Sequence, residues 1–374
     1  MKNHIILLKL KGIFCLIIPS VLTFTINAQT FNPVVTAVPT LTISPDARGA
    51  GIGSVGAATS PDVYSQYWNP AKYIFTENEK AVSLSYSSWL SSLMKNYKLA
   101  YLSGYYHFND LNSISMSVGY LSKGKITFSQ DNDYIDMSVN LYEFYIDGAL
   151  AHKFTDNFSA SLAFRYINSN LYNELNYTGE TEIYAGNAVT VNLGTFYTKN
   201  LETGKLSLGM NISDIGTKIT FDNYATTKFL PANLRLGGSY SFSIDEDKLL
   251  SINADINKLL VPSQNGNEDY ENTSALQGGI LSFNDAPGGI SEELREITLS
   301  TGVEYSSNNQ LFLRAGYFHE SPTKGYRSHY SIGGGYALGN LHLDMAYLIS
   351  TQSAVNFVDR MLIMSLSYNI SPTH

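Results

Sequence analysis

Hydrophobic and polar residues alternate along most of this chain. Between about Val82 and Ile370, roughly fourteen stretches of ten or so residues carry apolar side chains at every second position. A period of two is typical of β-strands that have one apolar and one polar face. Stretches of this length, separated by turn residues, predict an all-β fold: a transmembrane antiparallel β-barrel of about 14 strands over residues 81–374.

The connections between these stretches alternate between short and long. The short ones are rich in the Asn, Asp and Gly that close tight hairpins, and they cover residues 109–112, 155–157, 200–204, 243–246, 307–309 and 339–340. In outer-membrane barrels the short turns face the periplasm and the long loops face the exterior. An even number of strands therefore follows if both termini are periplasmic, as we expect.

Charged residues provide the decisive test of a barrel, because a charge that faces lipid costs about 2–4 kcal/mol near the bilayer midplane. In the stretch 141–153, Tyr142 and Phe144 alternate with Glu143. The same alternation predicts that seven charged side chains point into the lumen. We interpret them as paired charges of a polar interior, with a transport path as the alternative: Glu143, Asp147, Arg165, Asp255, Glu304, Arg314 and Asp344.

A targeting segment precedes the barrel. Lys2, Lys9 and Lys11 are followed by the apolar run 12–26 and by Ala28, a small residue suited to cleavage. We predict a signal peptide over residues 1–28 and a location in the outer membrane of a Gram-negative bacterium. The only cysteine, Cys15, lies within this segment, so the mature chain has no thiols for disulfides or metal sites.

Composition narrows the possible functions. The formal net charge is −8, and removal of residues 1–28, which hold three lysines and no acids, moves it to −11. So acidic a chain has no electrostatic basis for binding nucleic acid. The 27 tyrosines and 18 phenylalanines suit aromatic girdles at the two membrane interfaces, although strand propensity alone also favours these residues.

Residues 29–80 lack the alternation and are rich in Gly, Ala and Pro. We expect them to form a plug inside the barrel and call them the plug segment. Residues 51–56 match the G-x-G-x-x-G fingerprint of dinucleotide-binding proteins, but no βαβ unit surrounds them, so we expect small residues packed against the barrel wall. Trp68, Asn69 and Pro70 are expected to form a rigid corner around a buried aromatic ring.

No group of residues indicates catalysis. The seven histidines are scattered, with none at metal-ligand spacing, and no nucleophile-elbow sequence marks a Ser-His-acid trio. We therefore predict a protein that is not an enzyme, with no catalytic residues, no metal ligands and no cofactor.

Several segments carry a family resemblance. Ser44 to Gly56, followed by Tyr67-Trp68-Asn69-Pro70-Ala71, resembles the N-terminal hatch of the FadL superfamily of fourteen-stranded outer-membrane barrels. Together with four more specific segments, it resembles the PorV family of the type IX secretion system over essentially the whole mature chain. These four segments are residues 229–237, 254–262, 291–296 and 314–320.

The resemblance implies a shuttle rather than an enzyme. PorV-like proteins bind the C-terminal signal domain of a secreted cargo protein as it leaves a Sov-like translocon barrel, and deliver it to a PorU-like attachment complex. The implied partners are therefore cargo domains, the translocon, the attachment complex and outer-membrane lipid. The alternative is a FadL-like channel for the uptake of hydrophobic small molecules, because that superfamily shares the plug and the barrel.

The longest connection, about residues 258–295, is the candidate docking surface. It contains more apolar residues than solvent exposure alone favours. We predict that six of them contact cargo or a partner: Leu276, Ile280, Leu281, Phe283, Ile290 and Leu294. The alternative is that the loop folds over the barrel and buries them itself. A short helix is expected over residues 291–296, with Ser291 as its N-cap and Glu292 and Glu293 in its first turn.

Overall fold

The computed structural model describes residues 31–88, 97–128, 137–170, 185–221, 227–264, 270, 272–351 and 361–370. The chain divides into two compact units, Met1–Phe31 and Asn32–His374, and the barrel belongs to the second. The predicted signal peptide lies outside the described residues. None of the helices in the described part of the chain is long and apolar enough to cross a membrane.

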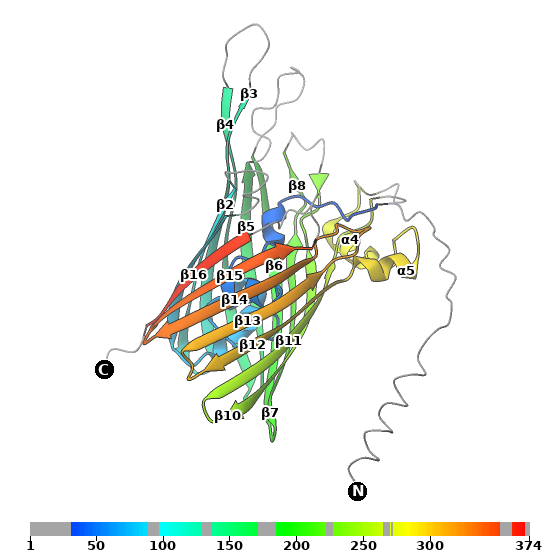
Figure 1. Cartoon of the computed structure of the whole chain (residues 1–374). Coiled ribbons are helices and arrows are strands. Elements are labelled where there is room, and N and C mark those ends of the chain that lie inside the picture. Colours follow the sequence, from blue (N-terminus) through cyan, green and yellow to red (C-terminus); the bar gives the residue numbers. More distant parts are fainter. Residues whose placement is uncertain are drawn as a thin grey trace. The chain divides into compact units, whose positions relative to one another are not determined.

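The second unit is a closed antiparallel barrel of fourteen strands, which confirms the predicted fold class (Figure 1). Neighbours in the barrel are neighbours in the chain, and β1 closes the ring against β16 with Lys80 opposite Ile370. The strands are β1 (Lys80–Ser88), β2 (Lys98–Asn109), β3 (Asn112–Phe128), β4 (Met137–Thr155), β5 (Phe158–Asn170), β6 (Gly186–Leu201), β7 (Gly204–Gly216), β10 (Asn233–Asp245), β11 (Lys248–Leu259), β12 (Thr298–Ser307), β13 (Leu311–His319), β14 (His329–Leu338), β15 (Leu341–Ser350) and β16 (Met361–Ile370). A separate pair, β8 (Ile219–Thr220) and β9 (Thr227–Lys228), lies within the connection from β7 to β10.

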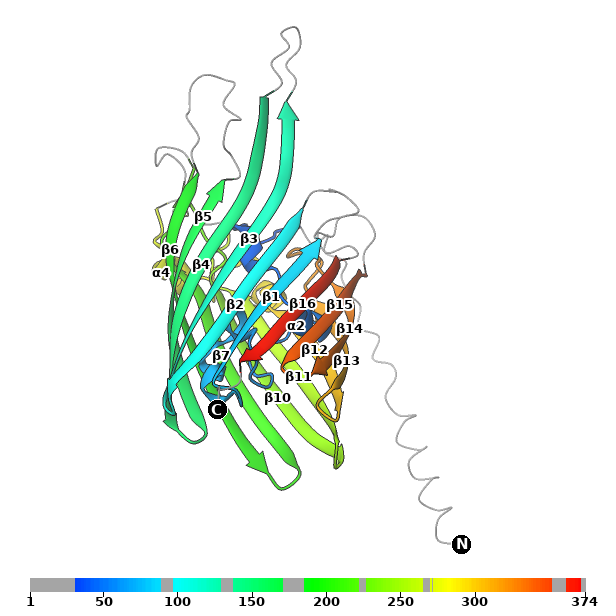
Figure 2. The same ribbon diagram turned by 90° about the vertical axis from the view of Figure 1, so that its left-hand side faces the viewer.

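All six predicted hairpins are confirmed, and they gather at one end of the barrel. Asn308, Asn309 and Gly339 have positive φ, which explains why Asn and Gly occupy these turns. The long connections gather at the opposite end, which we call the mouth. There β3 and β4, the longest strands, extend beyond their neighbours (Figure 2).

The described chain enters at the mouth and leaves at the hairpin end. The Asn32 N–H donates to the Thr323 carbonyl oxygen in the connection between β13 and β14, with 2.9 Å between N and O. Ile370, by contrast, pairs with Lys80 at the hairpin end. The two termini themselves lie outside the described residues, so their periplasmic location stays a prediction.

The barrel wall has the two faces that the sequence pattern predicts. In β1, Ser83 and Ser85 are buried while Val82 and Leu84 are exposed, and the same alternation continues around the ring. An outward apolar face is what lipid requires. All seven charged side chains that we expected in the lumen are buried, which confirms their inward orientation.

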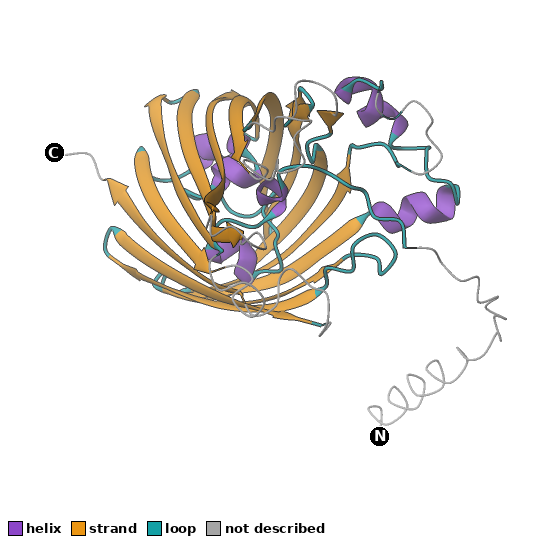
Figure 3. Cartoon of the chain, turned by 90° about the horizontal axis from the view of Figure 1, so that it is seen from above, coloured by secondary structure: helices purple, strands orange, loops and turns teal. Residues whose placement is uncertain are grey.

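The plug segment lies inside the ring of strands (Figure 3). Its short helices are η1 (Pro39–Thr42), α2 (Ala47–Gly51), α3 (Ser65–Trp68) and η2 (Pro70–Phe75). Glycines of the wall let its backbone approach closely: a Cβ at Gly209 would overlap the Ala57 carbonyl, and one at Gly316 would overlap the Gly53 amide. The expected packing of small residues against the wall is therefore confirmed. The connection from β11 to β12 carries three further short helices: α4 (Ala275–Leu281), α5 (Ile290–Glu293) and η3 (Leu294–Glu296).

Candidate functional site

The centre of the plug is built around Trp68. The Trp68 indole N–H donates to Asp46, with 2.6 Å between Nε1 and Oδ2, and its ring fills the space left by the missing side chains of Gly49 and Gly56. Asp46 also accepts the Gly49 amide and thereby caps α2. Burial is the main cause that raises the pKa of Asp46 to about 6.

The residues after Trp68 tie the plug to the wall. Asn69 caps η2 by accepting the Ala71 N–H, and its amide donates to the carbonyl oxygens of Ala57 and Thr195, the second of which belongs to β6. Pro70 occupies the first helical position, where its lack of an N–H costs nothing. Asn69 thus joins two plug segments and one wall strand.

Two groups of paired charges span the lumen wall. Arg165 contacts Asp147 at 2.8 Å and Asp214 at 2.6 Å, while Arg314 contacts Glu304 at 2.6 Å and Asp344 at 2.5 Å. Each arginine thus neutralises one buried carboxylate of the adjacent strand and one of the second strand away, Asp214 on β7 and Asp344 on β15, and buried charges need such partners. These contacts support the interpretation of paired structural charges.

The plug contributes to this charge network. Arg48 contacts Glu304 of the wall at 2.7 Å and Asp62 of the plug at 2.5 Å. Asp255 corrects our expectation of an ion pair, because it instead accepts the Gly56 and Ala57 amides at 2.8 and 3.0 Å. Backbone amides can satisfy a buried carboxylate as an ammonium or guanidinium group does.

Two lysines and three glutamates, which we call the clamp, form ion pairs that fix the connection between β11 and β12 in place. Lys258 contacts Glu293 at 3.0 Å and Glu296 at 2.7 Å, and Lys324 contacts Glu292 at 2.6 Å and Glu296 at 3.0 Å. These five side chains are nearly buried and join three chain segments. The sequence analysis did not single out the two lysines, because no sequence motif around them indicates that they pair with acids several tens of residues away.

Glu292 is the link from the clamp to the plug segment. Its Oε1 accepts from the Asn32 amide at 2.9 Å, and its Oε2 accepts the Gly288 N–H at 2.7 Å. Burial opposes ionisation of Glu292, but the donors Lys324, Asn32 and Gly288 outweigh it and lower the pKa to about 2. The first described residues of the plug are thus fastened to the loop by a charge-assisted hydrogen bond.

The helix predicted in this loop exists, but its cap was wrong. α5 begins at Ile290, and its N-cap is Gly289 with φ 66° rather than Ser291. Glu293 explains the shift, because its Oε1 accepts the Asp285 and Ala286 amides at 2.7 and 2.8 Å and thereby closes the preceding turn. Glu292 and Glu293 do lie in the first turn, as expected.

The six predicted contact residues are all exposed, from Leu281 at 39% to Ile280 at 76%, and we call them the apolar loop face. The loop does not bury them itself. The acids Glu292, Glu293 and Glu296 are turned inward to the clamp, which leaves Asp285 as the one partly exposed charged residue of 274–294. Charges inside and apolar groups outside are the reverse of an ordinary surface loop.

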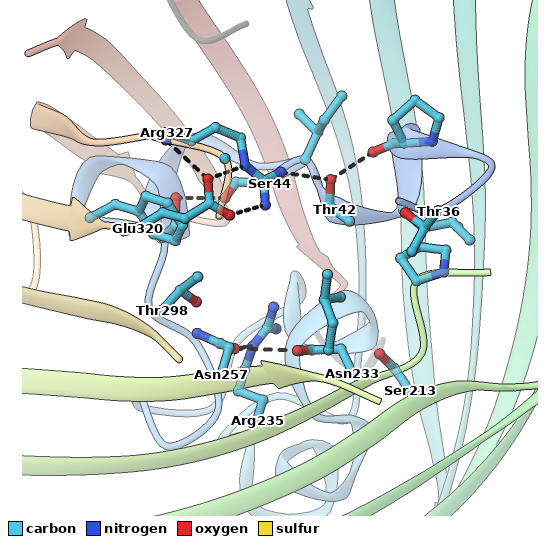
Figure 4. Close-up of a pocket in the computed structure, with 18 of the residues that line it drawn as sticks. Thr36, Thr42, Ser44, Ser213, Asn233, Arg235, Asn257, Thr298, Glu320 and Arg327 are labelled. Atoms are coloured by element: carbon cyan, nitrogen blue, oxygen red, sulfur yellow. Dashed lines mark hydrogen bonds and ion pairs between the residues drawn. The ribbon is translucent and has the colours of Figure 1, made fainter. Parts of the chain in front are cut away.

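A cavity of about 400 Å³ lies at the mouth, between the plug and the wall (Figure 4). Leu41, Thr42, Tyr67 and Trp68 are among the plug residues that line it. Wall residues from several strands complete it, among them Asn233, Arg235, Asn257, Thr298 and His329. Its size and its mixture of apolar and polar groups are typical of ligand sites.

The described residues offer no metal centre. No group of three or more His, Cys, Asp or Glu within them is arranged to hold a metal ion.

A family model described as type IX secretion system protein PorV matches residues 26–266. The chain belongs to the PorV family. The match covers the plug and the strands up to β11, so two of the four PorV-like segments noted in the sequence, residues 291–296 and 314–320, lie beyond it. Membership of the PorV family assigns the chain to type IX secretion, and family and fold together indicate the outer membrane.

Solved structures agree on the fold. The toluene transporter TodX of P. putida superposes with a TM-score of 0.56 at 14% identity, over 88% of this chain and 99% of that chain. A TodX mutant, described as a monoaromatic hydrocarbon channel, gives 0.53 at 13% identity, over 87% and 99%. Identities this low show a shared fold and nothing of the function. A comparison with curated proteins finds no match.

Proposed function

We propose that this chain is a non-enzymatic outer-membrane component of type IX secretion. It binds the C-terminal signal domain of a secreted cargo protein at a Sov-like translocon barrel and carries it to a PorU-like attachment complex. The proposal rests first on membership of the PorV family. It also agrees with a lumen that the plug fills, since a shuttle needs a surface rather than an open pore.

The apolar loop face is the observation that carries this proposal. Ile280 and Ile290 expose about three quarters of their surface, whereas the acids beside them are held inside by the clamp. An apolar surface that the clamp holds in place at the mouth suits the docking of a folded partner, because little ordering entropy is lost on binding. We propose that the six residues of this face contact cargo or the translocon.

Affinity purification from native outer membranes tests the proposal. The tagged chain is extracted in mild detergent, and the co-purifying proteins are identified by mass spectrometry. We expect a large translocon barrel, a peptidase of the attachment complex and secreted proteins with intact C-terminal domains. A preparation that carries only lipid or fatty acid contradicts the shuttle function.

A paired variant tests the loop face itself. Ile280→Asp with Ile290→Asp places two charges on the face and is expected to reduce co-purification of partners at least tenfold, since each charge must be desolvated on docking. Gln310→Asp is the matched control, because Gln310 is exposed and polar and lies in the hairpin between β12 and β13, at the opposite end of the barrel, so its change leaves partner recovery unchanged. Full recovery with the double variant removes these residues from the contact surface.

The second candidate is a FadL-like channel for hydrophobic small molecules. It is favoured by the mouth cavity, whose mixed lining on the plug side includes the apolar residues Val34, Leu41 and Trp68. Uptake of a labelled fatty acid into vesicles that contain the purified chain tests it. Uptake above that of empty vesicles supports the channel, and its absence, together with partner recovery, supports the shuttle.

A further inference from the structure

The connection between β11 and β12 starts on the outer face of the barrel. Ala254 and Ile256 of β11 are exposed on that face, and Lys258 follows them at the same period of two. Its ammonium group is covered by Glu293 and Glu296 of the clamp, at 3.0 and 2.7 Å. The helices of this connection lie outside the ring of strands (Figures 1 and 3). The loop therefore lies beside the wall, at the mouth end of its lipid-facing surface.

Arg295 in η3 is the one arginine without a partner in the part of the chain that the structure describes. Among those residues no carboxylate lies within ion-pair distance of it, and its buried Nε has no hydrogen-bond acceptor. The acids of the clamp bond instead to lysines, to Asn32 and to backbone amides. The other described arginines all have ion pairs or hydrogen bonds: Arg48, Arg165, Arg235, Arg314 and Arg327. A half-buried guanidinium that lacks an acceptor favours a bound anion.

The position of Arg295 in the chain places it at the level of the lipid headgroups. Leu299, the first outward apolar residue of β12, follows four residues later and so lies at most about 14 Å away. The headgroup layer beside the hydrocarbon core is about 5–8 Å thick, a distance that an arginine side chain can cross. Because a 3₁₀-helix has three residues per turn, Arg295 projects away from both the exposed Leu294 and the inward Glu296. Glu296 and Thr298 line the mouth cavity and Arg295 does not, so its donors are available beside the wall.

A row of small residues crosses the wall below this arginine. Gly238, Ala254 and Thr301 are neighbours in register on β10, β11 and β12, and all three lie on the outer face. Larger apolar residues flank the row on both sides: Leu236, Ile256 and Leu299 toward the mouth, and Tyr240, Ile252 and Val303 toward the hairpin end. The Thr301 hydroxyl donates to the Asn253 carbonyl oxygen, so it needs no water in lipid. Since the strands of a barrel are inclined, the row is inclined too and can hold an acyl chain that crosses the leaflet obliquely (Figure 1).

We propose that the wall of β10, β11 and β12 binds one phosphate-bearing lipid of the leaflet at the mouth. Arg295 binds the phosphate, because a planar guanidinium fork matches its oxygens in two parallel hydrogen bonds. The row of Gly238, Ala254 and Thr301 takes an acyl chain between its two apolar flanks. The occupant is a lipid rather than a soluble anion, since the site continues the lipid-facing wall of the barrel. This lipid site is independent of cargo docking and goes beyond the proposed function.

Native mass spectrometry of the purified chain tests the lipid site. The chain is released from detergent micelles that contain one added probe, and the spectrum gives the fraction of chains that retain it. Dioleoylphosphatidylglycerol is compared with dioleoylglycerol, which has the same acyl chains and no phosphate, and with inorganic phosphate alone. We expect the phosphate-bearing lipid to bind at least ten times more tightly than either of the others, because only this lipid engages both Arg295 and the row.

Variants test the two parts of the site separately. Arg295→Gln is expected to lower the affinity for dioleoylphosphatidylglycerol to that for dioleoylglycerol, whereas Arg295→Lys keeps part of the difference because the charge remains and the fork does not. Ala254→Phe fills the row and should weaken the binding of both lipids about threefold, while the phosphate-bearing lipid stays preferred. Lys199→Gln, which removes an exposed charge at the hairpin end, is the matched control for Arg295→Gln and leaves lipid retention unchanged.

Equal retention of the two lipids overturns the lipid site. So does an Arg295→Gln chain that retains dioleoylphosphatidylglycerol like the parent chain, or unchanged retention of both lipids by Ala254→Phe. Inorganic phosphate that binds as tightly as the lipid would show an anion site without a lipid, which also overturns it. Partner recovery from native membranes is a separate readout, so the lipid site and the shuttle function can fail independently.

Discussion

Single glycines decide whether the plug fits the barrel. Gly316 on β13 faces the plug, where an added side chain would overlap the Gly53 backbone. We expect Gly316→Val to destabilise the docked plug by about 1–3 kcal/mol, the usual cost of overpacking. Gly334→Val on the neighbouring strand is the control, because a Cβ there meets only ordinary contacts. Ion conductance in planar bilayers measures the effect, and equal leakage of the two variants contradicts it.

Residue types predict orientation but not partners. Glu143, Asp147 and Arg314 could be placed in the lumen from the alternation alone, since lipid excludes charge from the other face. Their partners depend on the shear and register of the closed ring, which no local pattern encodes. Asp255 illustrates this point: its inward direction was predictable, whereas its bonds to the plug amides were not.

Glu292 makes the attachment of the loop depend on pH. Its pKa is lowered to about 2 in the folded chain, so its contribution to stability is fully present above the unfolded value of 4.5 and is lost as the pH falls toward 2. Hydrogen exchange of residues 272–296 should therefore increase, after correction for intrinsic rates, between pH 4.5 and 2. In Glu292→Gln this change should be smaller, and an unchanged profile contradicts the role of Glu292.

At the scale of elements, the clamp makes a long loop into a fixed surface. Removing one partner of a buried ion pair typically costs about 3–5 kcal/mol, because the other charge remains buried and unpaired. Lys324→Met is therefore expected to release the loop, with proteolytic cleavage within 272–296 at least ten times faster than in the parent chain.

Lys248→Met is the control for the clamp. Lys248 forms an exposed pair with Asp245 at 3.1 Å, and such pairs contribute little to stability. Its cleavage pattern should match that of the parent. If Lys324→Met also retains the parent pattern, the loop is held by contacts other than the clamp.

Hairpins and strands were predictable because their signals are local. Turn residues indicate where each strand ends, and the period of two indicates which face of the barrel wall each side chain lies on. The α5 cap was misplaced because Glu293 satisfies amides outside its own helix, so that the preceding turn sets where the helix begins. The mouth cavity was not predicted at all, since its lining comes from the plug and from several strands distant in sequence.

At the scale of the whole molecule, the plug depends on the barrel for its structure more than the barrel depends on the plug. The wall neutralises most of its own charges, through Arg165 with Asp147 and Asp214 and through Arg314 with Glu304 and Asp344. The plug instead depends on the wall for close packing and for hydrogen bonds. The barrel should therefore fold without the plug, whereas the plug has no fold of its own.

Deletion of residues 36–75 tests this asymmetry. We expect a folded barrel with an open, water-filled lumen, because Asp255 and Glu143 lose their plug partners but become hydrated. Its unfolding temperature should fall, and it should conduct ions in planar bilayers where the parent chain does not. Lys248→Met is the control, since it changes an exposed side chain at the hairpin end and leaves the plug in place. A plug-deleted chain that folds but stays closed would show that the mouth connections seal the lumen, and a chain that fails to fold would show that the wall depends on the plug.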